Sequence, residues 1–108
     1  MTAVFAYITV ESKEEAERIA RILVEEKLAA CANLIEGMRS VYRWQGRIEE
    51  AREIIVIAKT RDDLLESLTD RVRALHSYEC PCVVGLPVLG GNPDYLEWIA
   101  SETVDTSG

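Results

Sequence analysis

The sequence predicts an α+β protein whose elements follow the order β-α-β-β-α-β, with one further helix at the end. Two observations predict this class. Runs of β-branched and aromatic residues alternate with stretches in which apolar residues recur every three or four positions. Two of the β-type runs also follow one another directly, separated by Gln45-Gly46, which predicts a long hairpin. This order is that of the ferredoxin-like split β-α-β arrangement, an antiparallel sheet with helices on one face.

The first strand and the first helix come before the hairpin. The run from Thr2 to Val10 is mostly apolar, which is typical of a strand covered on both faces. Ser12 is the expected N-cap of the helix, and Glu15 stands three residues later to complete a capping box. Apolar residues at helical spacing then predict a helix that ends near Lys27: Ala16, Ile19, Ala20, Leu23 and Val24.

The hairpin is expected over residues 32–60, with its turn at Gln45-Gly46. Gln tolerates positive φ poorly, so both a two-residue turn and a loop of three or four residues fit the sequence. Gly37 interrupts the first run and predicts a bulge at Glu36-Gly37. At about 3.3 Å per residue the first run reaches roughly 43 Å, whereas a compact chain of this length has a diameter of about 34 Å. The tip of the hairpin should therefore extend beyond its own domain.

An overhanging hairpin predicts an oligomer. It exposes apolar side chains and strand edges unless another chain covers them. Cyclic symmetry allows each hairpin to lie on the next subunit and closes the ring. We expect Tyr42, Trp44 and Ile48 at this interface.

Three elements are expected after the hairpin. Thr60 is the expected cap of the second helix, with Asp63 in the reciprocal position. An apolar stripe that ends at His76 marks this helix: Leu64, Leu65, Leu68, Val72 and Leu75. A short strand is expected over residues 82–88, and its flanking prolines, Pro81 and Pro87, indicate that it is interrupted or lies near an edge. Asn92-Pro93 then opens the last helix, because Asn is a good N-cap and Pro suits the first helical position.

Length and charge limit the function. The 108 residues make one domain, expected over residues 1–104, with a flexible tail at 105–108. The net charge of −7 argues against nucleic acid and anionic membranes as partners and is compatible with binding cations. No apolar run approaches the ~20 residues of a membrane span, and the first ten residues resemble a strand rather than a signal peptide. Three cysteines, an odd number, fit a reducing compartment, and we expect a cytoplasmic location.

Several separate segments resemble the CutA divalent-cation-tolerance family. They lie in one register over roughly residues 3–100 and comprise Leu23 to Asn33, Ser40 to Gly46, Glu53 to Thr60, His76 to Pro81 and Asp94 to Ile99. The resemblance implies a tight homotrimer in which long hairpins join the sheets of neighbouring subunits. It also implies a function in tolerance of copper or another divalent cation, which the protein would bind weakly or as a sensor.

The sequence departs from the family pattern at two positions. The family's usual His-Pro-Tyr-Glu is His-Ser-Tyr-Glu here, with Ser77 in place of the proline. Ile8 stands where some members have a cysteine in the first strand, a candidate metal ligand. The second departure weakens any ligand set copied from those members.

One cluster has the chemistry of a metal site: His76, Glu79, Cys80 and Cys82 supply an imidazole, a carboxylate and two thiols within seven residues. Copper and zinc both accept imidazole and thiolate ligands. Each residue also has a structural alternative. The cysteines can be small apolar residues on one face of a strand. His76 can bond to the last carbonyls of its helix or be favoured by the helix's negative end.

Aromatic residues offer a second candidate site, a cleft at a subunit boundary formed by Trp44, Lys59, His76 and Tyr78. Packing between subunits is the alternative role for these aromatic side chains. Such a cleft supports an alternative function: a PII-like signalling or scaffolding trimer that binds a small metabolite or a partner protein, an analogy at the level of fold. The sequence has no phosphate loop, serine elbow or His-Glu-x-x-His pattern, and Cys31 leads into a strand. We therefore expect neither an enzyme nor an organic cofactor.

Overall fold

A computed structural model describes residues 2–103, so the tail predicted at 105–108 lies outside the described residues. The predicted α+β class and element order are confirmed. In chain order the elements are β1 (Ala3–Val10), α1 (Lys13–Glu25), β2 (Cys31–Trp44), β3 (Arg47–Arg61), the 3₁₀ helix η1 (Asp62–Leu64), α2 (Leu65–Leu75), β4 (Val83–Pro87) and α3 (Pro93–Ser101).

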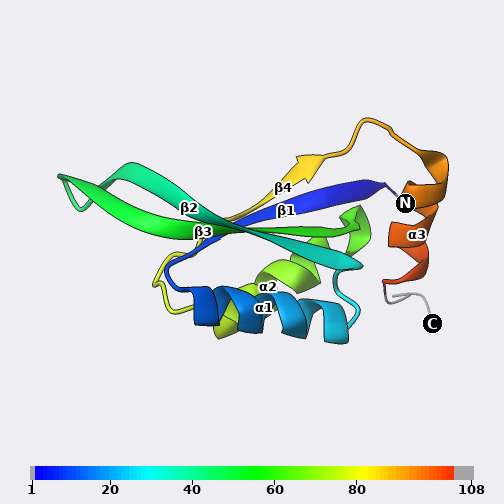
Figure 1. Ribbon diagram of the computed structural model, residues 1–108, viewed down its shortest axis with the longest axis horizontal. Helices are drawn as coiled ribbons and strands as arrows, with labels where there is room; N and C mark the ends of the chain where they lie inside the picture. The colour runs from blue at the N-terminus through cyan, green and yellow to red at the C-terminus, as the bar shows by residue number, and fades with distance from the viewer. Residues whose placement is uncertain (1, 104–108) are drawn as a thin grey trace.

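The strands form one antiparallel sheet in the order β2-β3-β1-β4, with α1 and α2 on one face (Figure 1). β1 is central: it pairs with β3 along its whole length and with β4 on its other side. Successive side chains of a strand point to opposite faces. Ala6, Ile8 and Val10 of β1 are fully buried toward the helices, so Tyr7 and Thr9 belong to the other face, which we call the open face.

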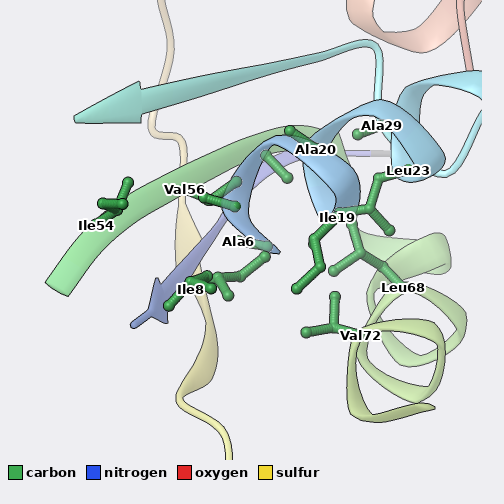
Figure 2. Packing of buried hydrophobic residues seen from close by; sticks show 13 residues of the cluster. Ala6, Ile8, Ile19, Ala20, Leu23, Ala29, Ile54, Val56, Leu68 and Val72 are labelled. Carbon is green, nitrogen blue, oxygen red and sulfur yellow. The ribbon is translucent and has the colours of Figure 1, made fainter. Parts of the chain in front are cut away.

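The hydrophobic core lies between the sheet and the two helices (Figure 2). Ile19 and Leu23 of α1 and Leu68 and Val72 of α2 are fully buried against the sheet. Each large apolar side chain buried in this way contributes about 1.5–3 kcal/mol. Val24, the last residue of the predicted α1 stripe, is exposed instead.

The hairpin turns at Gln45-Gly46 as predicted, in a tight two-residue turn. Trp44 pairs directly with Arg47, and φ is 51° at Gln45 and 80° at Gly46. Positive φ at both central residues is the signature of a type I′ turn, so the longer loop is excluded. The bulge also lies where it was predicted: the register shifts between Ile35 and Met38, and Gly37 has a φ of 85°.

The outer half of the hairpin extends beyond the helices (Figure 1). β1 pairs with β3 only from Ile54 to Arg61, so within residues 2–103 the first half of β3 has β2 as its sole strand neighbour. The molecule measures 44 Å along its longest axis and 26 and 23 Å along the others. The predicted overhang is confirmed, and it leaves Tyr42, Trp44 and Ile48 exposed.

The start of α2 differs from the prediction. Thr60 is not its cap, because β3 continues to Arg61 and the buried Thr60 hydroxyl donates a hydrogen bond of 2.7 Å to the Leu28 carbonyl. The Asp62 carboxylate instead accepts bonds of 3.0 Å from the backbone N–H groups of Thr2 and Asp63. These bonds, chiefly that from Thr2, hold the pKa of Asp62 below its usual value.

α3 lies at the end of the sheet opposite the hairpin tip (Figure 1). Its predicted cap is confirmed, since the Asn92 side chain accepts a bond of 3.1 Å from the Asp94 N–H. The helix packs against β1 and β3 and fully buries Ile99. It therefore covers one end of the sheet, and the part of the open face next to the hairpin stays uncovered by the described residues. None of the described helices has the length and apolar character needed to cross a membrane.

Candidate functional site

A pocket of about 630 Å³ opens on the open face, where the hairpin leaves the body of the molecule. Three segments far apart in the sequence line it: β1, the hairpin strands, and the segment between α2 and β4. Four aromatic side chains contribute to its walls: Tyr7, Tyr42, Trp44 and Tyr78. This volume lies in the range of small-molecule sites, about 300–1,000 Å³.

The Glu53 carboxylate of β3 also lines this pocket, and the residue is only 8% exposed. The Ser40 hydroxyl donates a bond of 2.5 Å to its Oε1 atom, and the Tyr78 hydroxyl donates one of 2.8 Å to its Oε2 atom. Both donors are neutral. Within residues 2–103, no lysine, arginine or histidine forms an ion pair with Glu53. Among the described residues, the buried Glu53 carboxyl group is therefore held by two hydroxyl groups.

Tyr78 is held in its protonated, donating form. Burial of its hydroxyl raises the pKa of Tyr78 well above the usual value, and the hydrogen bond to Glu53 raises it further. The negative charge of Glu11 acts in the same direction. The phenol therefore keeps its proton at any pH near neutrality and donates a hydrogen bond to Glu53.

A second buried carboxylate, Glu15 at the start of α1, anchors the segment that leads into β4. It accepts a bond of 2.7 Å from the Ser77 N–H and one of 2.8 Å from the Ser77 hydroxyl. The predicted capping box is therefore half formed. Ser12 caps α1 by accepting a bond of 3.2 Å from the Glu15 N–H, while the Glu15 side chain turns to Ser77.

The His76 ring is fully buried, and both of its nitrogens lie at hydrogen-bond distance from the backbone. Nε2 is 2.7 Å from the Thr9 carbonyl oxygen, and Nδ1 is 3.0 Å from the Tyr78 nitrogen. A carbonyl only accepts and an amide N–H only donates, so the neutral tautomer with its proton on Nε2 satisfies both contacts. In this conformation neither nitrogen is available to a metal ion.

The other three predicted metal ligands, Glu79, Cys80 and Cys82, line the pocket. Both cysteines are free thiols that are exposed in the single chain. Within residues 2–103, no three His, Cys, Asp or Glu side chains form a group that could hold a metal ion. The predicted set of four is therefore not assembled as a closed metal site in a single chain.

The structure brings only part of the predicted cleft together. Trp44 and Tyr78 line the same pocket. Lys59 lies elsewhere: its Nζ atom donates a bond of 3.0 Å to the Tyr95 hydroxyl and stands 5.4 Å from the centre of the Phe5 ring. That hydrogen bond raises the pKa of Lys59.

The burial of Glu53 was missed, because the sequence favoured a solvated or paired charge for this hairpin carboxylate, with cation gathering as the alternative. A signal for it exists in the sequence, because Glu53 has the same strand parity as Ile55 and Ile57. Residues of one parity point to one face of a sheet, so Glu53 shares its face with these apolar residues.

Comparison with known proteins decides the family. The model of the family described as CutA1 divalent ion tolerance protein matches residues 4–102. The chain belongs to this family. A CutA1 relative described as a divalent-cation tolerance protein from Thermus thermophilus is 47% identical over 96 residues, which is 89% of this chain and 93% of the relative.

Solved CutA1 structures share the fold. The crystal structure of CutA1 from Oryza sativa has a TM-score of 0.95 and 42% identity, over 98% of this chain and 97% of that chain. The structure of a CutA described as periplasmic, from Archaeoglobus fulgidus, has a TM-score of 0.90 and 44% identity, over 93% of this chain and 97% of that chain.

These CutA1 comparisons also correct the expected location. The rice relative described as chloroplastic is 45% identical over 101 residues, which is 94% of this chain but only 57% of the relative. Together with the protein from Archaeoglobus fulgidus described as periplasmic, it shows that this domain occurs outside the cytoplasm. The cytoplasmic prediction is therefore wrong, because the residues that build the domain do not specify a compartment.

Proposed function

We propose that this CutA1-family protein acts in divalent cation tolerance as a homotrimer that binds soft or borderline cations weakly, at Glu79, Cys80 and Cys82. The observation that supports the proposal most directly is that two exposed free thiols, separated by one residue, line one pocket. Membership of a family named for divalent ion tolerance supports the general role.

The donor set favours particular cations. Thiolates bind copper and zinc and are poor ligands for magnesium and calcium, which prefer oxygen. A carboxylate and two thiols leave a coordination position for solvent or for a donor of another subunit. Such an open site suits reversible binding, as a tolerance or sensing function requires.

His76 serves this site as a positioning residue. Its ring joins the end of β1, through Thr9, to the Tyr78 backbone, and so fixes the start of the segment that carries Glu79 and the thiols. We expect metal binding to depend on the two cysteines directly and on His76 only through the placement of this segment.

The homotrimer is proposed from the uncovered surface of the hairpin. Tyr42 and Trp44 are each 43% exposed, and Ile48 is 61% exposed. Three subunits related by cyclic symmetry would cover each hairpin with the next sheet and leave no strand edge open. No observation favours the PII-like alternative. The family is named for ion tolerance rather than for a reaction, and the expectation that the protein is not an enzyme stays a prediction.

Calorimetric titration of the purified protein with zinc and with copper tests the cation site. We expect Cys80→Ser/Cys82→Ser to weaken binding about tenfold or more, because hydroxyl groups are poor ligands for these ions. Cys31→Ser is the matched control, since Cys31 lies in β2 outside the pocket, and it should leave the affinity unchanged. Equal affinities of the double variant and the unmodified protein would refute the assignment.

A further inference from the structure

The Nδ1 atom of His76 lies between two groups that require opposite protonation of it. In the neutral ring, Nδ1 accepts a hydrogen bond from the Tyr78 N–H at 3.0 Å, while Nε2 donates one to the Thr9 carbonyl oxygen at 2.7 Å. The Oε2 atom of Glu15 lies 3.6 Å from the same Nδ1 atom, and a carboxylate can only accept a bond. Nδ1 therefore serves Tyr78 without a proton and Glu15 only with one.

A proton on Nδ1 would exchange these two partners. The new N–H group would face the Tyr78 N–H, and two donors cannot form a hydrogen bond with each other. The Glu15 Oε2 atom accepts a bond of 2.7 Å from the Ser77 N–H and keeps capacity for another. Because 3.6 Å is too long for a hydrogen bond, the ring must move toward Glu15 to form one. The exchange takes place within one chain, since the His76 side chain is already 0% exposed there.

The charged side chains that contact His76 or residues next to it are mostly carboxylates: Glu15 of α1, Glu11 before it and Glu53 of β3, with Arg18 of α1 as the cation. The Ser77 hydroxyl donates a bond of 3.3 Å to Glu11, and the Arg18 guanidinium donates one of 3.1 Å to the Leu75 carbonyl. α2 adds the negative end of its helix, because His76 is its C-cap. A positive charge on the ring would therefore have negative groups close to it.

We propose that His76 is a proton switch that controls the segment of residues 77–82. With a neutral ring, the Tyr78 backbone is tied to β1 through His76. With a protonated ring, His76 bonds to Glu15 and this tie is released. The segment carries no regular secondary structure, so the loss of one backbone bond loosens it. Imidazole is the side chain that ordinarily changes charge between about pH 5 and about pH 8, so the device responds to mild acid.

The switch acts on the link between the body of the molecule and the hairpin. The Tyr78 hydroxyl donates a bond of 2.8 Å to Glu53 of β3, and release of the Tyr78 backbone weakens the support of that bond. The proposal concerns a response of the fold to protons and goes beyond cation tolerance. Its tests contain no metal ion, so its failure and a failure of the thiol site are separate results.

The first test uses the unmodified protein without a histidine tag. His76 is the chain's only histidine, so the imidazole C–H signals in a proton NMR spectrum belong to it alone. These signals are followed from about pH 8 to about pH 5, together with amide hydrogen exchange of residues 76–82 by mass spectrometry. Exchange of this segment is divided by that of α3 at each pH, which cancels the general effect of pH on amides.

We expect this relative exchange to rise about tenfold or more as the pH falls, with the same midpoint as the ring signals. The rise follows from the lost bond between Tyr78 and His76. A constant ratio while the ring gains its proton would overturn the proposal. A ring that stays neutral down to about pH 5 would overturn it too.

The second test uses variants that change one partner at a time. In His76→Asn the side-chain oxygen can accept the N–H two residues later, as in an Asx turn, but cannot be protonated. The relative exchange of this variant should match the unmodified protein at about pH 8 and stay constant down to about pH 5. An increase equal to that of the unmodified protein would refute the role of the ring.

Glu15→Gln removes the counter-charge of the protonated ring, so the transition should move to lower pH. Glu14→Gln is the matched control, because Glu14 is the exposed neighbour of Glu15 in the first turn of α1, and it should leave the midpoint unchanged. The same midpoint in both variants would contradict the proposed exchange of partners. The first test needs no variant and decides the proposal if a substitution prevents folding.

Discussion

Two buried carboxylates, Glu53 and Glu15, organise the segment between α2 and β4. The Tyr78 hydroxyl donates a hydrogen bond to Glu53. The hydroxyl of Ser77, the residue directly before Tyr78, donates one to Glu15. Neighbouring side chains of one segment are thus fixed to β3 on one side and to α1 on the other. The segment carries no regular secondary structure, so these side-chain bonds set its position.

The hydrogen bond between Tyr78 and Glu53 should stabilise the fold measurably. We expect Tyr78→Phe to lower the free energy of unfolding by about 1–3 kcal/mol at neutral pH, because the buried Glu53 Oε2 atom loses its donor. Urea denaturation followed by circular dichroism measures this difference. Tyr95→Phe is the control: its hydroxyl contacts Lys59 at an exposed site, and the loss should be smaller.

The same pair predicts a pH dependence. The pKa of Tyr78 is raised in the folded state above its ordinary value of 10.0, so its contribution to stability is complete below that pH. As the pH rises further, the unfolded chain releases this proton first, and the contribution is lost. The difference in unfolding free energy between the unmodified protein and Tyr78→Phe should therefore shrink above pH 10.0. A constant difference up to about pH 11 would contradict the raised pKa.

The sequence predicted the roles of some of these residues and not of others. Ser12 was predicted as a cap because capping depends on local spacing, and Ser12 does cap α1. Glu15 satisfied the same local pattern, yet its side chain bonds to Ser77, which is 62 positions away. The role of Glu15, like the buried state of the His76 ring, depends on tertiary contacts that spacing along the chain does not encode.

At the level of elements, the hairpin was the most predictable part. Its turn and its bulge each contain a glycine with positive φ, and glycine marks such positions in a sequence. The boundary between β3 and α2 was predicted wrongly, because the residue at this boundary fits two roles. Thr60 is both a frequent N-cap and a good strand residue, and its bond to Leu28 across the fold decides between these roles.

The turn offers a clean test of backbone conformation. A Cβ atom added at Gly46 meets nothing within 4 Å, so Gly46→Ala changes only the cost of a positive φ. We expect a loss of about 1–2 kcal/mol in unfolding free energy, the usual penalty for a left-handed residue with a side chain. Gly90→Ala is the matched control, with equally open space and no positive φ, and should stay within about 0.5 kcal/mol. Equal losses of unfolding free energy for the two substitutions would contradict this prediction, because they would show that the turn changes its backbone conformation without cost.

At the level of the whole molecule, the hairpin predicts the assembly. Light scattering of the purified protein should give about 36 kDa, three times the 12.1 kDa of one chain. Trp44→Ala should lower this mass or leave an unfolded chain, because a central interface tryptophan often contributes more than about 2 kcal/mol. Trp98→Ala is the comparison, since Trp98 lies on α3 away from the hairpin. A folded 12.1 kDa monomer of the unmodified protein at micromolar concentration would contradict the trimer.

The central position of β1 has a consequence for synthesis of the protein. β1 is synthesised before the other described elements, but its partners lie between Ile54 and Arg61 in β3 and between Val83 and Pro87 in β4. Translation proceeds at roughly 5–20 residues per second, so β1 waits several seconds before either neighbour exists. During that time the apolar Val4 and Ile8 have no sheet to join, and the nascent chain depends on its surroundings to keep them from aggregating. Folding of this protein is therefore a late event in its own translation.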